Sequence, residues 1–308
     1  MIVKERDDMS KKTMQKAKDD KFNEYYTQYE TIEKEMIYYV EYFENKIIYC
    51  NTDDINSNFW KYFDDNFEKF KLKKLIATKY NKNGNGEKYE LLIENNKKKY
   101  YKTKLKEDGD FGSNECIEIL KESDIIITNP PFSLFRKFID IIMKYNKNFI
   151  ILGHQNAITY KDFYPFIINK RIWLGVSIHL GGTKFEVPSD SNLNTNRTIK
   201  EGNKLFIEIS GVRWFTNLSH NVEPSFLNLT KKYNEKDYPK YDNKNAIHID
   251  KTKNIPYDYD GLMGVPITFL DKYNSKQFEI IGFRKGDDDK DLTIKGKQCY
   301  FRILIRKR

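Results

Sequence analysis

Short apolar runs alternate with helix-like segments from residue 46 to residue 177, and this alternation constrains the possible fold more than any other feature of the chain. The apolar runs are KIIYCN (46–51), KKLIATKY (73–80), DIIIT (124–128), NFIILG (148–153) and IWLGVS (172–177). Strands that are apolar on both faces are typical of parallel sheets, because helices cover both sides of such sheets. The pattern therefore predicts an α/β fold with a Rossmann-like, mostly parallel sheet.

The segments between these runs carry the apolar spacing of helices. They are TIEKEMIYYVEYF (31–43), SNFWKYFDDNFEKF (57–70), SNECIEILKES (113–123), SLFRKFIDIIMKY (133–145) and a shorter one around KDFYPFIIN (161–169). Ser57 precedes an aromatic-rich run and is expected to cap the N-terminus of a helix. YELLIE and KYYKTKL, joined by NNKK, predict a β-hairpin over residues 89–105.

The pattern changes near Val187, where a polar, loop-like stretch (188–204) begins. Beyond it lie the β-leaning runs KLFIEISGVRWFTNL (204–218) and YFRILIRK (300–307), with long turn-rich connections between them. These runs predict a second region of mixed α+β structure, with a boundary at about residue 190. The polar first 21 residues are predicted to form a flexible tail.

The charge balance of the chain is basic, with 54 lysines and arginines against 45 aspartates and glutamates and a formal net charge of +9. A basic balance suits a polyanionic partner such as nucleic acid, but a compositional bias towards Lys, Asn, Ile and Tyr explains it equally well. No apolar run approaches the ~20 residues of a membrane span, and the first residues lack the apolar core of a signal peptide. We therefore expect a cytoplasmic protein without membrane contact. The three cysteines and four histidines are scattered and form no CxxC pair, so neither a metal site nor a disulfide framework is expected.

The strand DIIIT leads into the corner Asn129-Pro130-Pro131-Phe132 and then into a helix. A following proline holds Asn129 in an extended conformation, and Pro130 offers a carbonyl but no N–H. The Asn129 side-chain oxygen and the Pro130 carbonyl can therefore accept both hydrogens of an exocyclic amine, which makes its nitrogen more nucleophilic. Phe132 can stack on the ring that bears the amine. The corner suits an adenine or cytosine amine or an amide nitrogen; the alternative is a rigid turn in which Asn129 caps the helix.

Two acidic motifs fit the electrophile that such an amine needs. Asp53 and Asp54 follow the first strand, where a carboxylate can meet an ammonium group or ribose hydroxyls, and S-adenosylmethionine carries both. Asp110 and Phe111 precede a helix, where the carboxylate can accept a hydrogen bond from an adenine amine and the ring can pack on the base. Each motif also occurs in ordinary solvated loops. Their order along the chain, next to strand ends and helix starts, favours the functional interpretation.

Four stretches of the chain resemble the EcoRI-type adenine-N6 DNA methyltransferases of restriction–modification systems. They are NEYYTQY (23–29), IIYCNTDD (47–54), NPPF (129–132) and YDGLMGVPITFLDKYNSKQFEIIGFRKG (259–286). The resemblance extends from about residue 22 to the end of the chain and is weakest between residues 178 and 235. It implies site-specific methyl transfer from S-adenosylmethionine to the N6 amine of a flipped-out adenine in duplex DNA.

The resemblance also implies roles for individual residues. The implied cofactor-binding residues are Tyr25, Tyr26, Thr27, Asp53, Asp54, Asp110 and Phe111. The implied catalytic residues are Asn129, Pro130, Pro131 and Phe132. Phe185, in KFEVP (184–188), is implied to stack on the flipped base together with Phe132. The chain departs from the general methyltransferase pattern because the turn CNTDDINSNF (50–59) has no glycine and KKLIATKY has no acidic residue at its end.

The implied organisation is a catalytic domain over residues 22–190 and a target-recognition region over residues 191–308, whose basic side chains contact phosphates. The implied partner is double-stranded DNA, bound by a monomer that needs no metal. A companion restriction endonuclease would act on the same site without forming a stable complex. Two alternatives remain open: an RNA or protein-glutamine methyltransferase, and a catalytically dead DNA-binding module on the same scaffold.

Overall fold

The structure is a computed structural model that describes most of the chain. It describes residues 26–179, 182–187 and 198–308. The predicted tail (1–21), Tyr25 and the predicted boundary near residue 190 lie outside the described residues.

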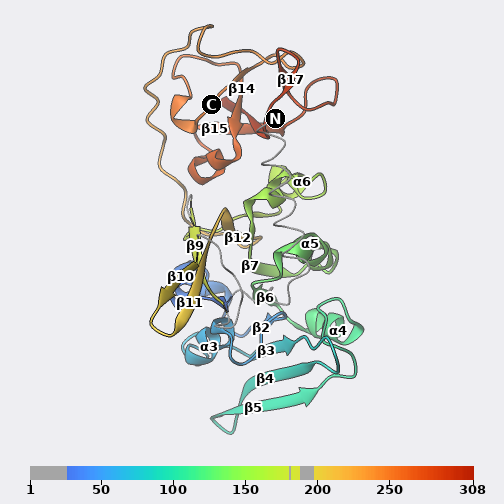
Figure 1. Ribbon diagram of the computed structural model, residues 1–308. Coiled ribbons are helices and arrows are strands. Elements are labelled where there is room, and N and C mark those ends of the chain that lie inside the picture. Colours follow the sequence, from blue (N-terminus) through green and yellow to red (C-terminus); the bar gives the residue numbers. More distant parts are fainter. Residues whose placement is uncertain (1–25, 180–181, 188–197) are drawn as a thin grey trace. The chain divides into compact units, whose positions relative to one another are not determined.

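The chain divides into two compact units (Figure 1). Unit 1 draws on residues 1–154 and 175–220, and unit 2 on residues 155–174 and 221–308. The chain therefore leaves unit 1 after its last parallel strand, contributes a short segment to unit 2, and returns. The roles predicted for the segments before and after residue 190 remain predictions.

A mixed sheet forms the centre of unit 1. Its parallel strands lie side by side in the order β3 (Lys74–Lys79), β2 (Ile47–Cys50), β6 (Ile125–Thr128) and β7 (Asn148–His154). The antiparallel hairpin of β4 (Glu87–Glu94) and β5 (Lys97–Lys104) extends the sheet beyond β3. On the other side β12 (Val212–Thr216) pairs antiparallel with β7. The short strand β8 (Trp173–Leu174) belongs to the segment that unit 2 takes from this part of the chain. Parallel pairing is thus confirmed for the four central strands, whereas the outer strands make the sheet mixed.

Helices cover both faces of this sheet. Their bounds are α2 (Tyr29–Met36), α3 (Asn58–Asp65), α4 (Asn114–Glu122) and α5 (Phe135–Lys144), with 3-10 turns η1 (Val40–Tyr42) and η2 (Phe132–Leu134). One core cluster joins α2 and α3 to alternate strand residues such as Ile48, Leu75 and Ile150, and Figure 1 shows α4 and α5 on the other side of the sheet. The predicted cap is confirmed, because the Ser57 side chain accepts a hydrogen bond from the backbone N–H of Trp60 at 3.1 Å.

A smaller antiparallel sheet adds to unit 1. Its order is β1 (Tyr26–Thr27), β9 (Gly182–Val187), β11 (Lys204–Ser210) and β10 (Thr198–Glu201). The register places Thr27 opposite Phe185. The buried carboxylate of Glu35 on α2 fixes the segment that follows Leu174, because it accepts hydrogen bonds from the N–H groups of Val176 and Ser177 at 2.9 and 2.6 Å.

Unit 2 is built on a second, mainly antiparallel sheet with short helical turns. The sheet order is β13 (Ala246–His248), β14 (Leu262–Pro266), β18 (Arg302–Lys307) and β15 (Phe278–Phe283). The remaining elements are η3 (Gln155–Thr159), α6 (Tyr164–Ile168), η4 (Thr252–Asn254), η5 (Ile267–Lys272) and the hairpin β16 (Thr293–Ile294) and β17 (Lys297–Gln298). Tyr164 on α6 stacks on Phe283 at 5.7 Å, which fixes the 155–174 segment to this unit.

Two sequence predictions differ from the observed elements. The run IWLGVS forms only the two-residue strand β8. The run GVRWFTNL, predicted to belong to the C-terminal region, forms β12 and completes the central sheet of unit 1. All five residues of β12 are buried, which is the physical reason that it lies in a sheet core. Among the residues that the structure describes, no helix is long and apolar enough to cross a membrane.

Candidate active site

The carboxyl ends of the four parallel strands meet at one edge of the central sheet, where open α/β sheets bind their ligands. Asp53 lies three residues beyond the end of β2, and Asn129 directly follows β6. β2 and β6 are neighbours in the sheet. The fold therefore brings a predicted cofactor residue and a predicted catalytic residue to the same place, although they are far apart in the sequence.

A chain of hydrogen bonds joins these two residues. The Thr128 hydroxyl, at the end of β6, donates to Oδ2 of Asp53 at 2.5 Å. The Thr52 hydroxyl lies 2.5 Å from the Thr128 hydroxyl and 3.3 Å from the backbone carbonyl oxygen of Asn129. Sequence reasoning missed Thr52 and Thr128. Their only sequence signal is that each is a polar residue at the end of an apolar strand.

The two adjacent carboxylates have different environments. Burial raises the pKa of Asp53 from 3.8 to about 7, against the opposing effect of hydrogen bonds from Thr128 and Ser57. Asp54 instead pairs with Lys79, at the end of β3, with a distance of 2.8 Å between Nζ and Oδ2. Its other oxygen accepts from the N–H of Asn56 at 2.8 Å. Asp53 is therefore the carboxylate that lies beside the corner, and Asp54 closes its own turn.

The corner itself is held from both sides. Pro130 and the Asn129 side-chain oxygen Oδ1 are buried, and the carbonyl of Pro131 accepts the N–H of Leu134 at 2.9 Å to start η2. The half-buried ring of Phe132 meets Phe185 edge-on, with ring centroids 6.3 Å apart and planes at 81°. Phe185 is fully buried in the core of unit 1. Phe185 therefore packs against the edge of the Phe132 ring, and its stacking on a flipped base remains a prediction.

The strand β1 adjoins the same edge. Asn58, at the start of α3, donates its Nδ2 to the carbonyl of Thr27 at 2.8 Å. Two buried side-chain oxygens here, Oγ1 of Thr27 and Oδ1 of Asn51, have no hydrogen-bond partner among the residues that the structure describes. Because a buried polar atom without a partner is costly, these atoms fit the hydroxyl and amino groups of a polar cofactor. Asn51, which follows β2, is a further residue that sequence reasoning missed.

The loop with Asp110 and Phe111 lies against the end of β3. Gly109 has φ +79°, and a Cβ there would stand 2.6 Å from the carbonyl oxygen of Lys79, so only glycine fits. Oδ1 of Asp110 accepts from Gly112 N at 2.8 Å and from Lys137 Nζ at 3.4 Å. The Phe111 ring is 5% exposed and packs edge-on against Phe138 on α5. The loop is thereby tied to the helix that follows the corner.

The structure thus brings the predicted site residues of unit 1 together at one sheet edge, and their individual roles remain predictions. Tyr25 lies outside the described residues. Within the described part of the chain, no group of three or more His, Cys, Asp or Glu side chains can hold a metal ion.

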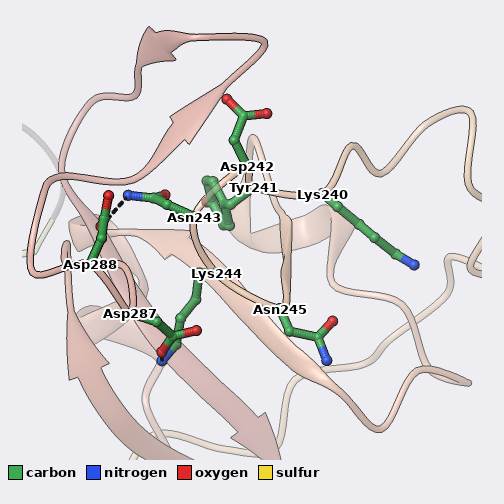
Figure 2. A pocket seen from close by; sticks show the side chains of 8 residues that line it. All are labelled: Lys240, Tyr241, Asp242, Asn243, Lys244, Asn245, Asp287 and Asp288. Carbon is green, nitrogen blue, oxygen red and sulfur yellow. Dashed lines mark hydrogen bonds and ion pairs between the residues drawn. The ribbon is translucent and has the colours of Figure 1, made fainter.

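Unit 2 has a polar pocket of about 460 Å³. Figure 2 shows its lining: Lys240, Tyr241, Asp242, Asn243, Lys244, Asn245, Asp287 and Asp288. Asn243 holds the pocket together, because its Nδ2 donates to Asp288 at 2.9 Å and its Oδ1 accepts from the N–H of Thr293 at 3.2 Å. The side chains of Lys240 and Asn245 are exposed.

The sequence matches known proteins over nearly its whole length. The family model described as adenine-specific methyltransferase EcoRI matches residues 13–308. The chain is 49% identical to type II methyltransferase M.EcoRI of Escherichia coli, and the match covers 96% of each chain. It is 40% identical to type II methyltransferase M.MgeORF184P of Mycoplasma genitalium, over 95% of this chain and 98% of that protein. It is 36% identical to type II methyltransferase M.MpnI of Mycoplasma pneumoniae, over 95% of this chain and 97% of that protein. No solved structure matches.

Proposed function

Because this chain belongs to the family of EcoRI adenine-specific methyltransferases, we propose that the strand-end site of unit 1 methylates the N6 amine of a flipped adenine, with S-adenosylmethionine as donor. The chain is a type II adenine-specific DNA methyltransferase of restriction–modification systems. The observation that carries the assignment of the site is the hydrogen-bond chain from Asp53 to the backbone of Asn129.

The cofactor site is formed by side chains that need a polar ligand. The Asp53 carboxylate would receive the ammonium group of the cofactor, and a positive partner would lower its raised pKa again. Oγ1 of Thr27 and Oδ1 of Asn51 would hydrogen-bond its polar groups, and the Asp110–Phe111 loop would hold its adenine. When bound, S-adenosylmethionine supplies a methyl group activated by a positively charged sulfur.

The target adenine is held by the corner after β6. Oδ1 of Asn129 and the carbonyl of Pro130 would accept the two hydrogens of the N6 amine, which localises the lone pair on nitrogen for transfer. The adenine must leave the duplex to reach them, and the half-buried Phe132 ring would stack on it. Phe185 holds Phe132 in place. Most of the rate acceleration then comes from positioning amine and methyl group in line.

Unit 2 is proposed to recognise the DNA. It carries 21 lysines and arginines against 14 aspartates and glutamates, a formal net charge of +7 out of the +9 of the whole chain. Such an excess attracts phosphates, and the amide and lysine side chains of the pocket in Figure 2 are of the kinds that read base edges. A monomer acting beside an independent endonuclease remains part of this proposal.

The proposal is tested with purified protein and S-adenosylmethionine labelled on its methyl group. We expect label to appear as N6-methyladenine in duplex DNA, within one short sequence, and to be absent with Asn129→Ala. If the label is transferred to RNA or to protein glutamine instead, then that molecule, and not DNA, is the substrate. Cofactor and DNA binding without any transfer would indicate a DNA-binding module on a dead scaffold. Sequencing of methylated bases in cells that express the protein then gives the recognised site.

A further inference from the structure

We propose that Thr52 and Thr128 are positioning residues that couple the occupancy of the cofactor site to the catalytic corner, through a directional chain of hydroxyl hydrogen bonds. The inference rests on the proposed function, because it needs Asp53 to hold the cofactor and Asn129 to hold the adenine amine. It assigns a role to two hydroxyls that touch neither ligand.

The geometry of the chain is close and sheltered. Thr128 is fully buried, and its hydroxyl lies 2.5 Å from both Oδ2 of Asp53 and the Thr52 hydroxyl. The Thr52 hydroxyl also lies 3.3 Å from the carbonyl oxygen of Asn129. The four residues come from two segments, one that follows β2 and one at the end of β6, and these two parallel strands are neighbours in the sheet. Water exchange at a buried hydroxyl is hindered, so these bonds have no ready substitute.

Each hydroxyl has one hydrogen to donate, and this makes the chain directional. When Asp53 is ionised it can only accept, so Thr128 must donate to it. The oxygen of Thr128 is then free to accept from Thr52, at the shorter of the two distances open to that hydroxyl. The Asn129 carbonyl then receives no bond from Thr52.

The direction reverses when Asp53 is protonated. Its carboxyl group can donate to Thr128, Thr128 can donate to Thr52, and Thr52 can donate to the Asn129 carbonyl. The proton on Asp53 therefore decides whether Thr52 binds the backbone of the catalytic residue. A cofactor ammonium beside Asp53 favours the ionised form, so cofactor binding turns the chain away from Asn129.

Other groups around Asp53 do not take over this function. The charge of Asp54 acts on Asp53 and is paired with Lys79 of β3. The buried thiol of Cys50 has its pKa raised by burial and by Asp53, so it stays neutral. The Ser57 hydroxyl also hydrogen-bonds Asp53, and it caps α3 by accepting from the N–H of Trp60. The two threonines connect Asp53 with Asn129 directly.

Four variants test the proposal in the full-length protein. Thr128→Val removes the hydroxyl with little change of shape, and Thr128→Ser restores it. Thr52→Val breaks only the second half of the chain. Thr216→Val is the matched control, because Thr216 is a buried threonine of the same sheet whose hydroxyl donates to the carbonyl of Phe149 at 2.7 Å, outside the site. Calorimetry between pH 6 and 9 gives the Kd for S-adenosylmethionine, and single turnovers at saturating cofactor and DNA give the transfer rate.

We expect Thr128→Val to raise the cofactor Kd about tenfold at pH 7 and to move the pH midpoint of cofactor binding upward, because Asp53 loses a donor to its ionised form. The transfer rate should also fall, and Thr128→Ser should restore Kd, pH midpoint and rate. Thr52→Val should leave both the Kd and the transfer rate at saturating cofactor within about twofold, because Thr52 does not bind the Asn129 carbonyl when Asp53 is ionised. The control should match the wild type in all three measurements.

The coupling is wrong if folded Thr128→Val keeps the wild-type pH midpoint, if Thr128→Ser fails to rescue, or if Thr52→Val at saturating cofactor transfers at least about tenfold more slowly than the wild type. If Thr128→Val does not fold, the half-buried Thr52→Val and the serine variant still decide the question. A wild-type protein that binds no cofactor, or methylates no DNA, contradicts the proposed function instead. The two failures are therefore distinguishable.

Discussion

Unit 1 and unit 2 differ in net charge and in the burial of the polar side chains at their sites. Unit 1 is nearly balanced, with 33 lysines and arginines against 31 aspartates and glutamates, and it places one desolvated carboxylate at the strand ends. Unit 2 has a net charge of +7, and its pocket is lined by side chains that reach solvent, such as Lys240 and Asn245. One unit concentrates its polar chemistry in a buried network, and the other spreads charge over its surface.

The difference predicts how each unit responds to substitution. A buried polar group depends on a few fixed partners, so removing one atom changes its energy strongly. Exposed charges act together through a salt-screened field, so each contributes little. We therefore expect large, all-or-none effects in the strand-end network of unit 1 and small, graded, salt-dependent effects in unit 2.

The largest effect is expected for Asn129→Ala. Because this change removes one acceptor of the amine, the transfer rate in single turnovers should fall about 10²–10³-fold, the range found when one group that stabilises a transition state is lost. The Kd values for cofactor and DNA should stay within about threefold. Asn217→Ala is a suitable control, because Asn217 hydrogen-bonds the backbone of β7 at 2.9 Å away from the corner. Transfer by Asn129→Ala at the control's rate would contradict the assignment.

The next effect concerns stability and its pH dependence. Asp53 has its pKa raised from 3.8 to about 7, so its contribution to stability is full below pH ~3.8 and is lost as the pH rises through about 7. Asp53→Asn, which cannot ionise, should therefore raise the free energy of unfolding of the cofactor-free protein by about 2–4 kcal/mol at pH 8. The gain should shrink towards pH 4. Urea unfolding at both pH values measures it.

Asp54→Asn provides the contrast within the same turn. Asp54 is paired with the half-exposed Lys79, so its loss should lower stability by only about 0–1 kcal/mol. Asp53→Asn should weaken cofactor binding at least about tenfold, while Asp54→Asn should leave it unchanged. Equal effects of the two variants on the cofactor Kd would show that the buried network does not distinguish the neighbouring carboxylates.

A smaller effect is expected for Phe132→Leu. Leucine keeps apolar contact with Phe185 but cannot stack on a base, so kcat/KM should fall about tenfold, within the range measured for base–aromatic stacking. A duplex with 2-aminopurine at the target adenine should brighten when the wild-type protein binds, because the base leaves the stack. The variant should change that fluorescence without changing the cofactor Kd. An unaltered signal and rate would mean that another ring stacks on the base.

The regular elements around the site were predictable from local patterns. The apolar runs predicted β2, β3, β6 and β7, and turn residues predicted the β4–β5 hairpin. These predictions succeed because apolar periodicity and turn preference depend on residues that are close together in the sequence. The cap at Ser57 was predictable for the same reason. The corner at Asn129 stood out in the sequence because two adjacent prolines remove backbone N–H donors and conformational freedom, and an ordinary turn does not need them.

The features that the sequence did not predict depend on contacts between residues that are far apart in the chain. Asp53 and Asp54 are adjacent acidic residues in the sequence, and contacts with Thr128, 75 residues away, and with Lys79 distinguish them in the fold. The pairing of Thr27 with Phe185 across β1 and β9 leaves no pattern in either segment. The sequence did not predict that β12 pairs with β7 in the central sheet, because an apolar strand can be buried in the core of either unit. Local sequence indicates which residues can do chemistry, and tertiary contacts decide which of them do.

The smallest effect tests the charge of unit 2. Lys240 lines the pocket with an exposed side chain, and Lys34 on α2 is an exposed lysine of unit 1 that serves as its match. If Lys240 neutralises one phosphate, Lys240→Gln should weaken duplex binding about two- to threefold at moderate salt and reduce the slope of log K against log salt by about 0.9. Lys34→Gln should leave the slope unchanged. Anisotropy titrations at several salt concentrations measure both. A slope change for Lys34→Gln but not for Lys240→Gln would move DNA binding from unit 2 to unit 1 and break the comparison between a unit for chemistry and a unit for recognition.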